Sequence, residues 1–183
     1  KSGLSGVELY GKTLGLVAVG RIGAAVAARA VAMGMKVLAY DPFLSDDDIR
    51  RRQASPAALD DLLAASDFIS IHSPLTDQTK GMINTQAFAK MKNGVRLVCA
   101  ARGGVIDEAA LLAALESGKV AGAALDVFAT EPPGLTPLTA HPKVIGTPHV
   151  GAQTAEAQTR AGIDIAEEVA AVLEGRQARW KVW

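Results

Sequence analysis

Residues 13–41 constrain the fold of this chain more than any other stretch. An apolar run over residues 14–19 ends in a turn that contains Gly20 and Gly23, and a helical pattern opens near Arg21. A second apolar run, residues 36–40, stops at Asp41. A strand, a glycine turn, a helix, a strand and an acid in this order predict a parallel βαβ unit.

The same stretch predicts a ligand. Small residues at the turn let main-chain N–H groups approach a pyrophosphate, and the helix that begins near Arg21 directs unpaired donors and a positive dipole end toward it. Asp41 lies about 20 residues after the turn, where a carboxylate can accept hydrogen bonds from a ribose diol. Because this acid repels a 2′-phosphate, the expected cofactor is NAD rather than NADP.

Ala18 departs from the dinucleotide-binding pattern. A full fingerprint has glycine at this position, followed by glycines at the positions of Gly20 and Gly23. Ala18 adds a methyl group where the turn is tightest, and we expect it to lower cofactor affinity.

Composition narrows the class of protein. The 183 residues suit one domain, 49% of them are apolar, and 19 basic residues balance 19 acidic ones. Nucleic acid and anionic membranes are therefore poor candidates for partners. The single cysteine, Cys99, excludes an internal disulfide, and no apolar run approaches the roughly 18 residues of a membrane span. We expect a cytoplasmic protein, and the first residue, Lys1 rather than Met, suggests a piece of something longer.

Apolar spacing predicts the first helix and the strand after it. The helix should end at Gly34, and the strand over residues 36–40 follows at once. The apolar residues expected to face the sheet are Ile22, Val26, Ala30 and Met33.

Residues 42–65 give a less regular pattern. Ser45, followed by three aspartates, predicts the start of a short charged helix. Ser55 and Pro56 predict the N-cap and first residue of a helix that runs through Ala65. A third strand between these helices should be very short or absent.

The remainder alternates strands and helices. Strands are expected over residues 67–72, 95–99, 121–127 and 144–146. Helices should follow the caps Asn84 and Asp107, and a long one should cover residues 154–173, with an apolar stripe of Ala155, Ile163, Ala166, Val169 and Val172. This order predicts an α/β fold: a doubly wound parallel sheet (Rossmann fold) with helices on both faces.

Polar residues gather at the expected strand ends. Ligands of open α/β sheets bind beyond the carboxyl ends of the strands, so a single crevice could hold all of these residues. His72 and His141 are expected to be structural, and three scattered histidines with one cysteine indicate no metal site. The strand-end candidates are Asp41, Ser73, Arg102, Asp126, Glu131 and His149.

Seven motifs in order give the chain a family resemblance. They are Gly-Lys-Thr-Leu-Gly (11–15), Gly-Arg-Ile-Gly (20–23), Tyr-Asp-Pro (40–42), Ala-Arg-Gly-Gly-Val-Ile-Asp-Glu (101–108), Ala-Ala-Leu-Asp-Val-Phe (123–128), Glu-Pro-Pro (131–133) and Thr-Pro-His-Val-Gly-Ala (147–152). The chain resembles the nucleotide-binding domain of the D-isomer-specific 2-hydroxyacid dehydrogenases, and within them the phosphoglycerate dehydrogenase branch of serine biosynthesis.

The resemblance implies three catalytic roles. Arg102 matches the arginine that grips the substrate carboxylate, for which a planar guanidinium is suited. His149 matches the acid/base that takes the hydroxyl proton as hydride leaves C2 for the nicotinamide, and Glu131 matches the acid paired with it.

The resemblance also implies a set of cofactor contacts. Gln153 stands where the family commonly has serine, and Cys99 where asparagine is usual, which bears on cofactor affinity more than on reaction type. The implied contacts to NAD are Gly20, Arg21, Ile22, Asp41, Ser73, Ala100, Arg102, Asp126, His149, Gly151 and Ala152.

A second domain is expected to be missing. The family inserts its nucleotide domain into a discontinuous substrate domain, so residues 1–183 are expected to be a single NAD-binding domain, with residues 1–11 and 176–183 as inter-domain connectors. Trp180 and Trp183 would then pack on the absent domain or fold back on this one. The resemblance suggests a homodimer in the full-length protein.

Two other classes of function are compatible with the sequence. Within the same family, D-lactate and glycerate (hydroxypyruvate) dehydrogenases compete with the phosphoglycerate branch. A non-catalytic NAD(H)-sensing module is a different class, but such corepressors carry an aromatic residue where this chain has Gly151 and Ala152.

Overall fold

The computed structural model describes residues 6–180 of the chain. These residues divide into two compact units, Lys1–Pro148 and His149–Trp183, and each unit is described by itself. Residues 1–5 of the expected N-terminal connector lie outside the described residues. So do residues 181–183 of the C-terminal connector, including Trp183.

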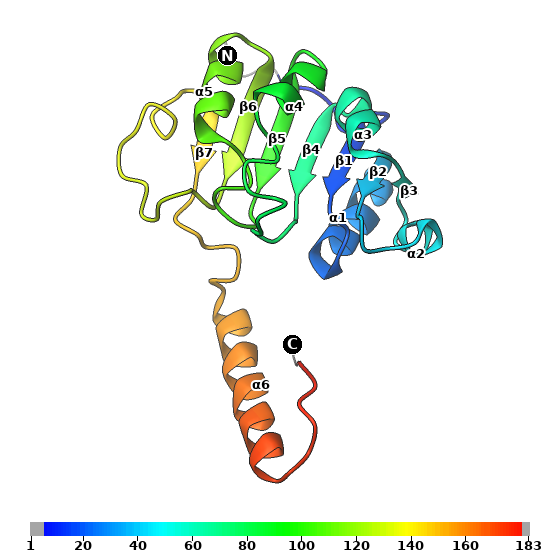
Figure 1. Cartoon of the computed structure of the whole chain (residues 1–183), viewed down its shortest axis with the longest axis vertical. Helices are drawn as coiled ribbons and strands as arrows, with labels where there is room; N and C mark the ends of the chain where they lie inside the picture. Colours follow the sequence, from blue (N-terminus) through cyan, green and yellow to red (C-terminus); the bar gives the residue numbers. More distant parts are fainter. Residues whose placement is uncertain (1–5, 181–183) are drawn as a thin grey trace. The chain divides into compact units, whose positions relative to one another are not determined.

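The first unit is built on a parallel sheet of seven strands (Figure 1). Their spatial order is β3-β2-β1-β4-β5-β6-β7, and every neighbouring pair is parallel. This confirms the predicted doubly wound topology. The strands are β1 (Thr13–Val17), β2 (Lys36–Tyr40), β3 (Ser55–Pro56), β4 (Phe68–Ile71), β5 (Val95–Cys99), β6 (Val120–Leu125) and β7 (Val144–Gly146).

The helix α1 (Arg21–Ala32) begins where the sequence predicts, but it buries a different stripe. Ile22 is 68% exposed and Met33 is 56% exposed. The buried residues of α1 are Gly23, Ala27 and Ala30. The expectation for Ile22 and Met33 was therefore wrong.

A close backbone contact explains the small buried stripe. A Cβ atom built on Gly23 would lie 2.7 Å from the carbonyl oxygen of Ala18. Because α1 lies this close to the end of β1, only small residues fit between them. The predicted end of the helix is confirmed, since Gly34 follows it with φ +76°.

The connection from β2 to β4 corrects a second expectation. The short helix α2 (Asp46–Arg51) is capped as predicted, since Ser45 accepts from the N–H of Asp48. Ser55 and Pro56, however, form the short strand β3, and α3 (Leu59–Ala65) begins only after Ala58. Because β3 is an edge strand, the missing N–H of Pro56 removes no hydrogen bond from a central ladder.

The helices α4 (Thr85–Lys90) and α5 (Glu108–Glu116) start at the predicted caps. Asn84 accepts from two N–H groups of α4, and Asp107 accepts from Ala110 N. These side chains satisfy main-chain donors that a helix leaves unpaired at its start.

Helices cover both faces of the sheet, but unequally. One buried cluster joins α3, α4 and α5 to strands β4, β5 and β6, and includes Leu63, Phe88 and Leu111. A smaller cluster joins α1 and α2 to β1 and β2. Within the first unit, α1 and α2 do not extend over β5 and β7: Val98 of β5 is 42% exposed and Ile145 of β7 is 70% exposed.

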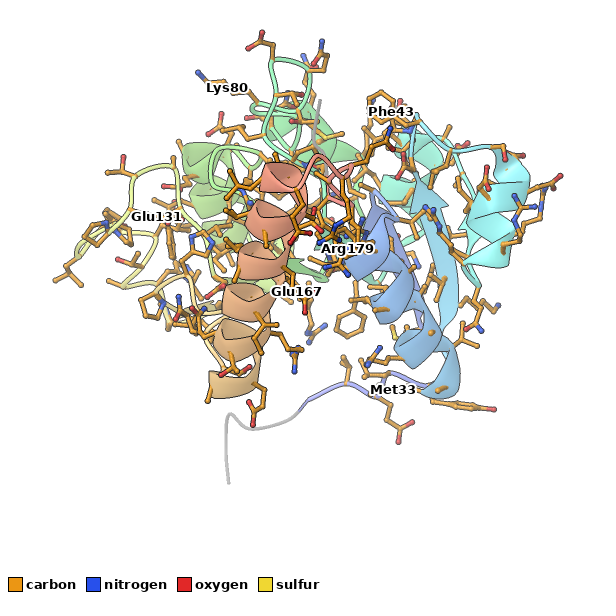
Figure 2. The ribbon with its side chains drawn as sticks, turned by 90° about the horizontal axis from the view of Figure 1, so that it is seen from below. Met33, Phe43, Lys80, Glu131, Glu167 and Arg179 are labelled. Atoms are coloured by element: carbon orange, nitrogen blue, oxygen red, sulfur yellow. The ribbon has the colours of Figure 1, made fainter. Side chains whose placement is uncertain are left out.

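The second unit contains α6 (Ala155–Leu173), the segment from His149 that leads into it and the segment after it. The helix covers the predicted range with Thr154 as its N-cap, but of the helix residues only Ala171 is buried, so the predicted apolar stripe is exposed. After the helix, Arg179 returns to pair with Glu167 at 2.8 Å and Glu168 at 2.7 Å (Figure 2). The Arg179 guanidinium lowers the pKa of the Glu168 carboxyl. Among residues 6–180, no helix has the length and apolar character needed to cross a membrane.

Ala18 adopts a backbone conformation that glycine would accept more easily. Its φ is +69°, and its N–H donates to the carbonyl of Tyr40 at 2.8 Å, which fixes the turn after β1. A non-glycine residue in this left-handed region costs roughly 1–2 kcal/mol.

We predict that Ala18→Gly raises the free energy of unfolding by about 0.5–1 kcal/mol, because relief of this strain exceeds the added entropy of glycine in the unfolded chain. Urea denaturation measures the change. The matched control is Ala25→Gly on the exposed side of α1, which should lose about 1 kcal/mol. Equal losses in both variants would show that Ala18 carries no strain.

Candidate functional site

The predicted site residues of the first unit follow the carboxyl ends of four strands. Asp41 comes after β2, Ser73 after β4, Arg102 after β5 and Asp126 after β6. The strand order reverses between β1 and β4, which is the point where open α/β sheets form their ligand crevice. Gly20 and Ser73 lie on the two sides of that point.

The turn between β1 and α1 has the features of an anion site. The N-cap is Gly20, no side chain caps the helix, and no acid lies in its first turn. A Cβ on Gly20 would meet nothing within 4 Å, so the main chain is open to a ligand. Uncapped N–H groups and the positive end of the helix dipole suit a phosphate group at Arg21 and Ile22.

Asp41 combines a structural contact with a position at a cavity. Its Oδ2 accepts from Val19 N at 3.0 Å and its Oδ1 from Phe43 N at 3.1 Å. The carboxylate therefore ties the turn after β1 to the end of β2, and each oxygen retains a lone pair for a ribose hydroxyl. The adjoining cavity of about 310 Å³ is also lined by Tyr40, Leu44, Ile49, Pro56 and Ala57.

Ser73 supplies the strongest single indication of a missing polar ligand in this unit. The residue is buried, and its Oγ has no hydrogen-bond partner among residues 6–180. A buried hydroxyl without a partner costs about 1–3 kcal/mol, so such groups are rare in folded proteins. The uncapped turn, the cavity beside Asp41 and this hydroxyl together fit a dinucleotide.

His72 is satisfied inside the protein, as expected from the sequence. Its Nε2 lies 2.9 Å from Ser70 Oγ, and its ring is the side chain nearest to Gly23. Burial lowers the pKa of His72 below its ordinary value of 6.5, which favours a neutral ring beside the cofactor turn.

Arg102 and Glu131 occupy two loops that touch. Both side chains are exposed, and the Arg102 guanidinium donates to the carbonyl of Ala101 at 2.6 Å. Glu131, labelled in Figure 2, accepts from Phe128 N at 3.0 Å. A Cβ on Gly103 would lie only 1.8 Å from the Phe128 carbonyl oxygen, so the two loops are in direct backbone contact.

Asp126 is buried and has a partner that the sequence analysis did not single out. The Thr147 hydroxyl donates to Asp126 Oδ1 at 2.5 Å, which links the ends of β6 and β7. Thr147 is part of the Thr-Pro-His motif, so its place two residues before His149 was the available signal.

His149, Gly151 and Ala152 belong to the second unit. His149 has φ +54°, a left-handed conformation uncommon outside glycine. The three predicted catalytic residues are thus divided, with Arg102 and Glu131 in the first unit and His149 at the start of the second.

Residues 6–180 contain no cluster of side chains that could bind a metal ion. No group of three or more His, Cys, Asp or Glu side chains in that range is placed to hold an ion. Cys99 is buried, and burial raises the pKa of its thiol, which keeps it protonated at neutral pH.

Comparison with known proteins places these features in a family. Residues 1–151 match the family described as "D-isomer specific 2-hydroxyacid dehydrogenase, NAD binding domain". D-3-phosphoglycerate dehydrogenase of Bacillus subtilis (strain 168) is 52% identical over 170 residues, covering 93% of this chain and 32% of the relative. The enzyme of the same name from Rattus norvegicus is 48% identical, with the same coverage. The chain therefore spans about a third of the length of these relatives.

Solved structures agree with this assignment. The D-lactate dehydrogenase of Lactobacillus jensenii with NAD⁺ is 36% identical with a TM-score of 0.89, covering 100% of this chain and 59% of that one. The holo D-mandelate dehydrogenase of Rhodotorula graminis is 33% identical with a TM-score of 0.90, covering 97% of this chain and 52% of that one.

We predict that His72 makes the stability of the chain depend on pH. The unfolded chain binds a proton at His72 below about pH 6.5, whereas the folded chain, with its lowered pKa, binds it only at a lower pH. Stability is therefore lost as pH falls from 6.5 toward the lower folded pKa.

Urea denaturation at pH 7 and pH 5 checks this. The difference between the two pH values should shrink in His72→Asn and persist in the control His141→Asn. An unchanged difference in His72→Asn would contradict the prediction.

Proposed function

The chain belongs to the D-isomer specific 2-hydroxyacid dehydrogenase family, as part of its NAD binding domain, and we propose that it serves hydride transfer at C2 of a D-2-hydroxy acid. The observation that carries this proposal is the cofactor edge of the first unit. There an uncapped helix start, a strand-end acid beside a cavity and an unpartnered serine hydroxyl follow neighbouring strands.

The chain's own residues would hold NAD along that edge. The N–H groups at Gly20, Arg21 and Ile22 would bind the pyrophosphate, and Asp41 the adenosine ribose. Ser73 would direct its unpaired hydroxyl to the nucleotide. When bound, NAD supplies a nicotinamide that accepts or donates a hydride. Ala100, Asp126, Gly151 and Ala152 are the further contacts that the family resemblance implies.

Three residues would act on the substrate. Arg102 would bind the carboxylate with two parallel hydrogen bonds, which orients C2. His149 would take the proton of the C2 hydroxyl during oxidation and return it during reduction. Glu131 would stabilise the resulting imidazolium, because a nearby carboxylate favours the charged ring. Both loops that carry Arg102 and Glu131 are in backbone contact, which supports a shared role.

D-3-Phosphoglycerate is the proposed substrate. The two relatives of that name compared above share 52% and 48% of aligned residues with this chain, whereas the D-lactate and D-mandelate enzymes compared above share 36% and 33%. D-Lactate and glycerate or hydroxypyruvate remain the alternatives. The groups that would select a phosphate lie in a substrate domain outside this chain. A homodimer stays a prediction from the family resemblance, and a cytoplasmic location a prediction from composition.

We predict that the chain binds NADH, and that Asp41→Asn lowers its preference for NADH over NADPH at least about tenfold. The substitution removes a negative charge that would face a 2′-phosphate, and each factor of ten corresponds to about 1.4 kcal/mol. Calorimetry with both cofactors measures the two dissociation constants. The control Asp60→Asn removes a charge from α3, outside the cavity lining, and should leave the preference unchanged. Absence of NADH binding at millimolar cofactor would refute the proposal.

The substrate proposal is tested on the natural protein that carries this chain. D-3-Phosphoglycerate should give a higher kcat/KM than glycerate or D-lactate. Arg102→Lys keeps the charge but loses the two-point geometry, so kcat/KM should fall by about 100-fold. The control Arg96→Lys alters a residue at the opposite ends of the strands. Equal or better activity on D-lactate would overturn the substrate assignment.

A further inference from the structure

The peptide group between Phe128 and Ala129 is held from both sides. Its carbonyl oxygen lies against the main chain of Gly103, where even a Cβ atom would be only 1.8 Å away. Its N–H donates to Oε1 of Glu108 at 2.6 Å. Because both halves of one peptide are in contact, the peptide plane cannot turn without breaking one of these contacts.

Glu108 is not needed to start the helix to which it belongs. Asp107 is the N-cap of α5 and accepts from Ala110 N at 3.0 Å. An acid in the first turn is favoured by the helix dipole, but that benefit needs no specific partner. The half-buried Glu108 side chain instead reaches Ala129, 21 residues further along the chain.

The held peptide lies between the two loops of the proposed active site. Phe128 N donates to Glu131 Oε1 at 3.0 Å, so two successive N–H groups bind the carboxylates of Glu131 and Glu108. Arg102 directly precedes Gly103, which contacts the carbonyl side. The position of the peptide therefore affects the Glu131 carboxylate and the Arg102 loop together.

The cavity that Glu108 lines is too small for a substrate. Glu108 and Arg102 line a cavity of only about 10 Å³, together with buried residues such as Leu111 and Val127. That volume holds at most about one water molecule. Within this cavity Glu108 can therefore act only through the protein, by its bond to Ala129 N.

We propose that Glu108 is a positioning residue, whose carboxylate fixes the peptide after Phe128 and thereby holds Glu131 at its working position relative to Arg102. This role rests on the proposed dehydrogenase function. Without the hydrogen bond, the peptide after Phe128 keeps its contact with Gly103 but loses the contact with Glu108. A displacement of about 1 Å at a catalytic group can cost up to about 100-fold in rate.

The test compares variants of the natural protein that carries this chain. Glu108→Ala should lower kcat by about tenfold while KM for NADH stays within about twofold of the wild-type value, because the cofactor turn and Asp41 are untouched. Glu108→Gln keeps an oxygen acceptor of the same reach and should restore kcat to within about threefold. The matched control, Glu116→Ala, removes the same charge from the exposed end of α5 and should leave kcat unchanged.

A third substitution separates positioning from folding. Glu108→Asp keeps the charge at the helix start but shortens the side chain by one methylene, so it should lower kcat as alanine does. If the alanine variant does not fold, the kcat of Glu108→Asp still tests whether Glu108 positions this peptide. A wild-type kcat in Glu108→Asp would overturn the positioning role. So would an equal loss of kcat in Glu108→Gln and Glu108→Asp. Neither outcome would affect the proposed dehydrogenase function. A wild-type protein inactive on every 2-hydroxy acid would overturn the proposed function and this role with it.

Discussion

The pairing of β1 with two parallel neighbours is the constraint on which the rest of the structure depends. β1 hydrogen-bonds to β2 on one side and β4 on the other, so the chain runs outward from β1 to β2 and β3 and then returns to form β4 on the opposite side of β1. Every later strand joins in parallel, which brings residues far apart in sequence to one edge. Asp41, Ser73, Arg102 and Asp126 meet at that edge because of strand direction, not because of local sequence.

Close backbone contacts then determine what that edge can bind. Gly23 lets α1 approach the end of β1, and this approach places the uncapped helix start beside the turn. The tight turn also forces Ala18 into a left-handed conformation. Asp41 accepts a hydrogen bond from Val19 N in the same turn. The residue proposed to bind the ribose therefore also stabilises the main chain proposed to bind the phosphates.

Local signals in the sequence predicted most of the helix starts and most of the strands. Ser45, Asn84 and Asp107 cap helices as expected, because capping involves only a few neighbouring residues. The buried face of α1 and the strand role of Pro56 were misjudged, because both depend on packing across the sheet. His149 shows the same limit: its motif identifies it, whereas its position relative to Glu131 depends on how two units are arranged.

The contact between Gly103 and the Phe128 carbonyl has an evolutionary consequence. A side chain at position 103, or a residue inserted near position 128, would separate the two loops, so a change in either requires a matching change in the other. Selection for a new substrate would therefore act with least resistance on surfaces away from this contact.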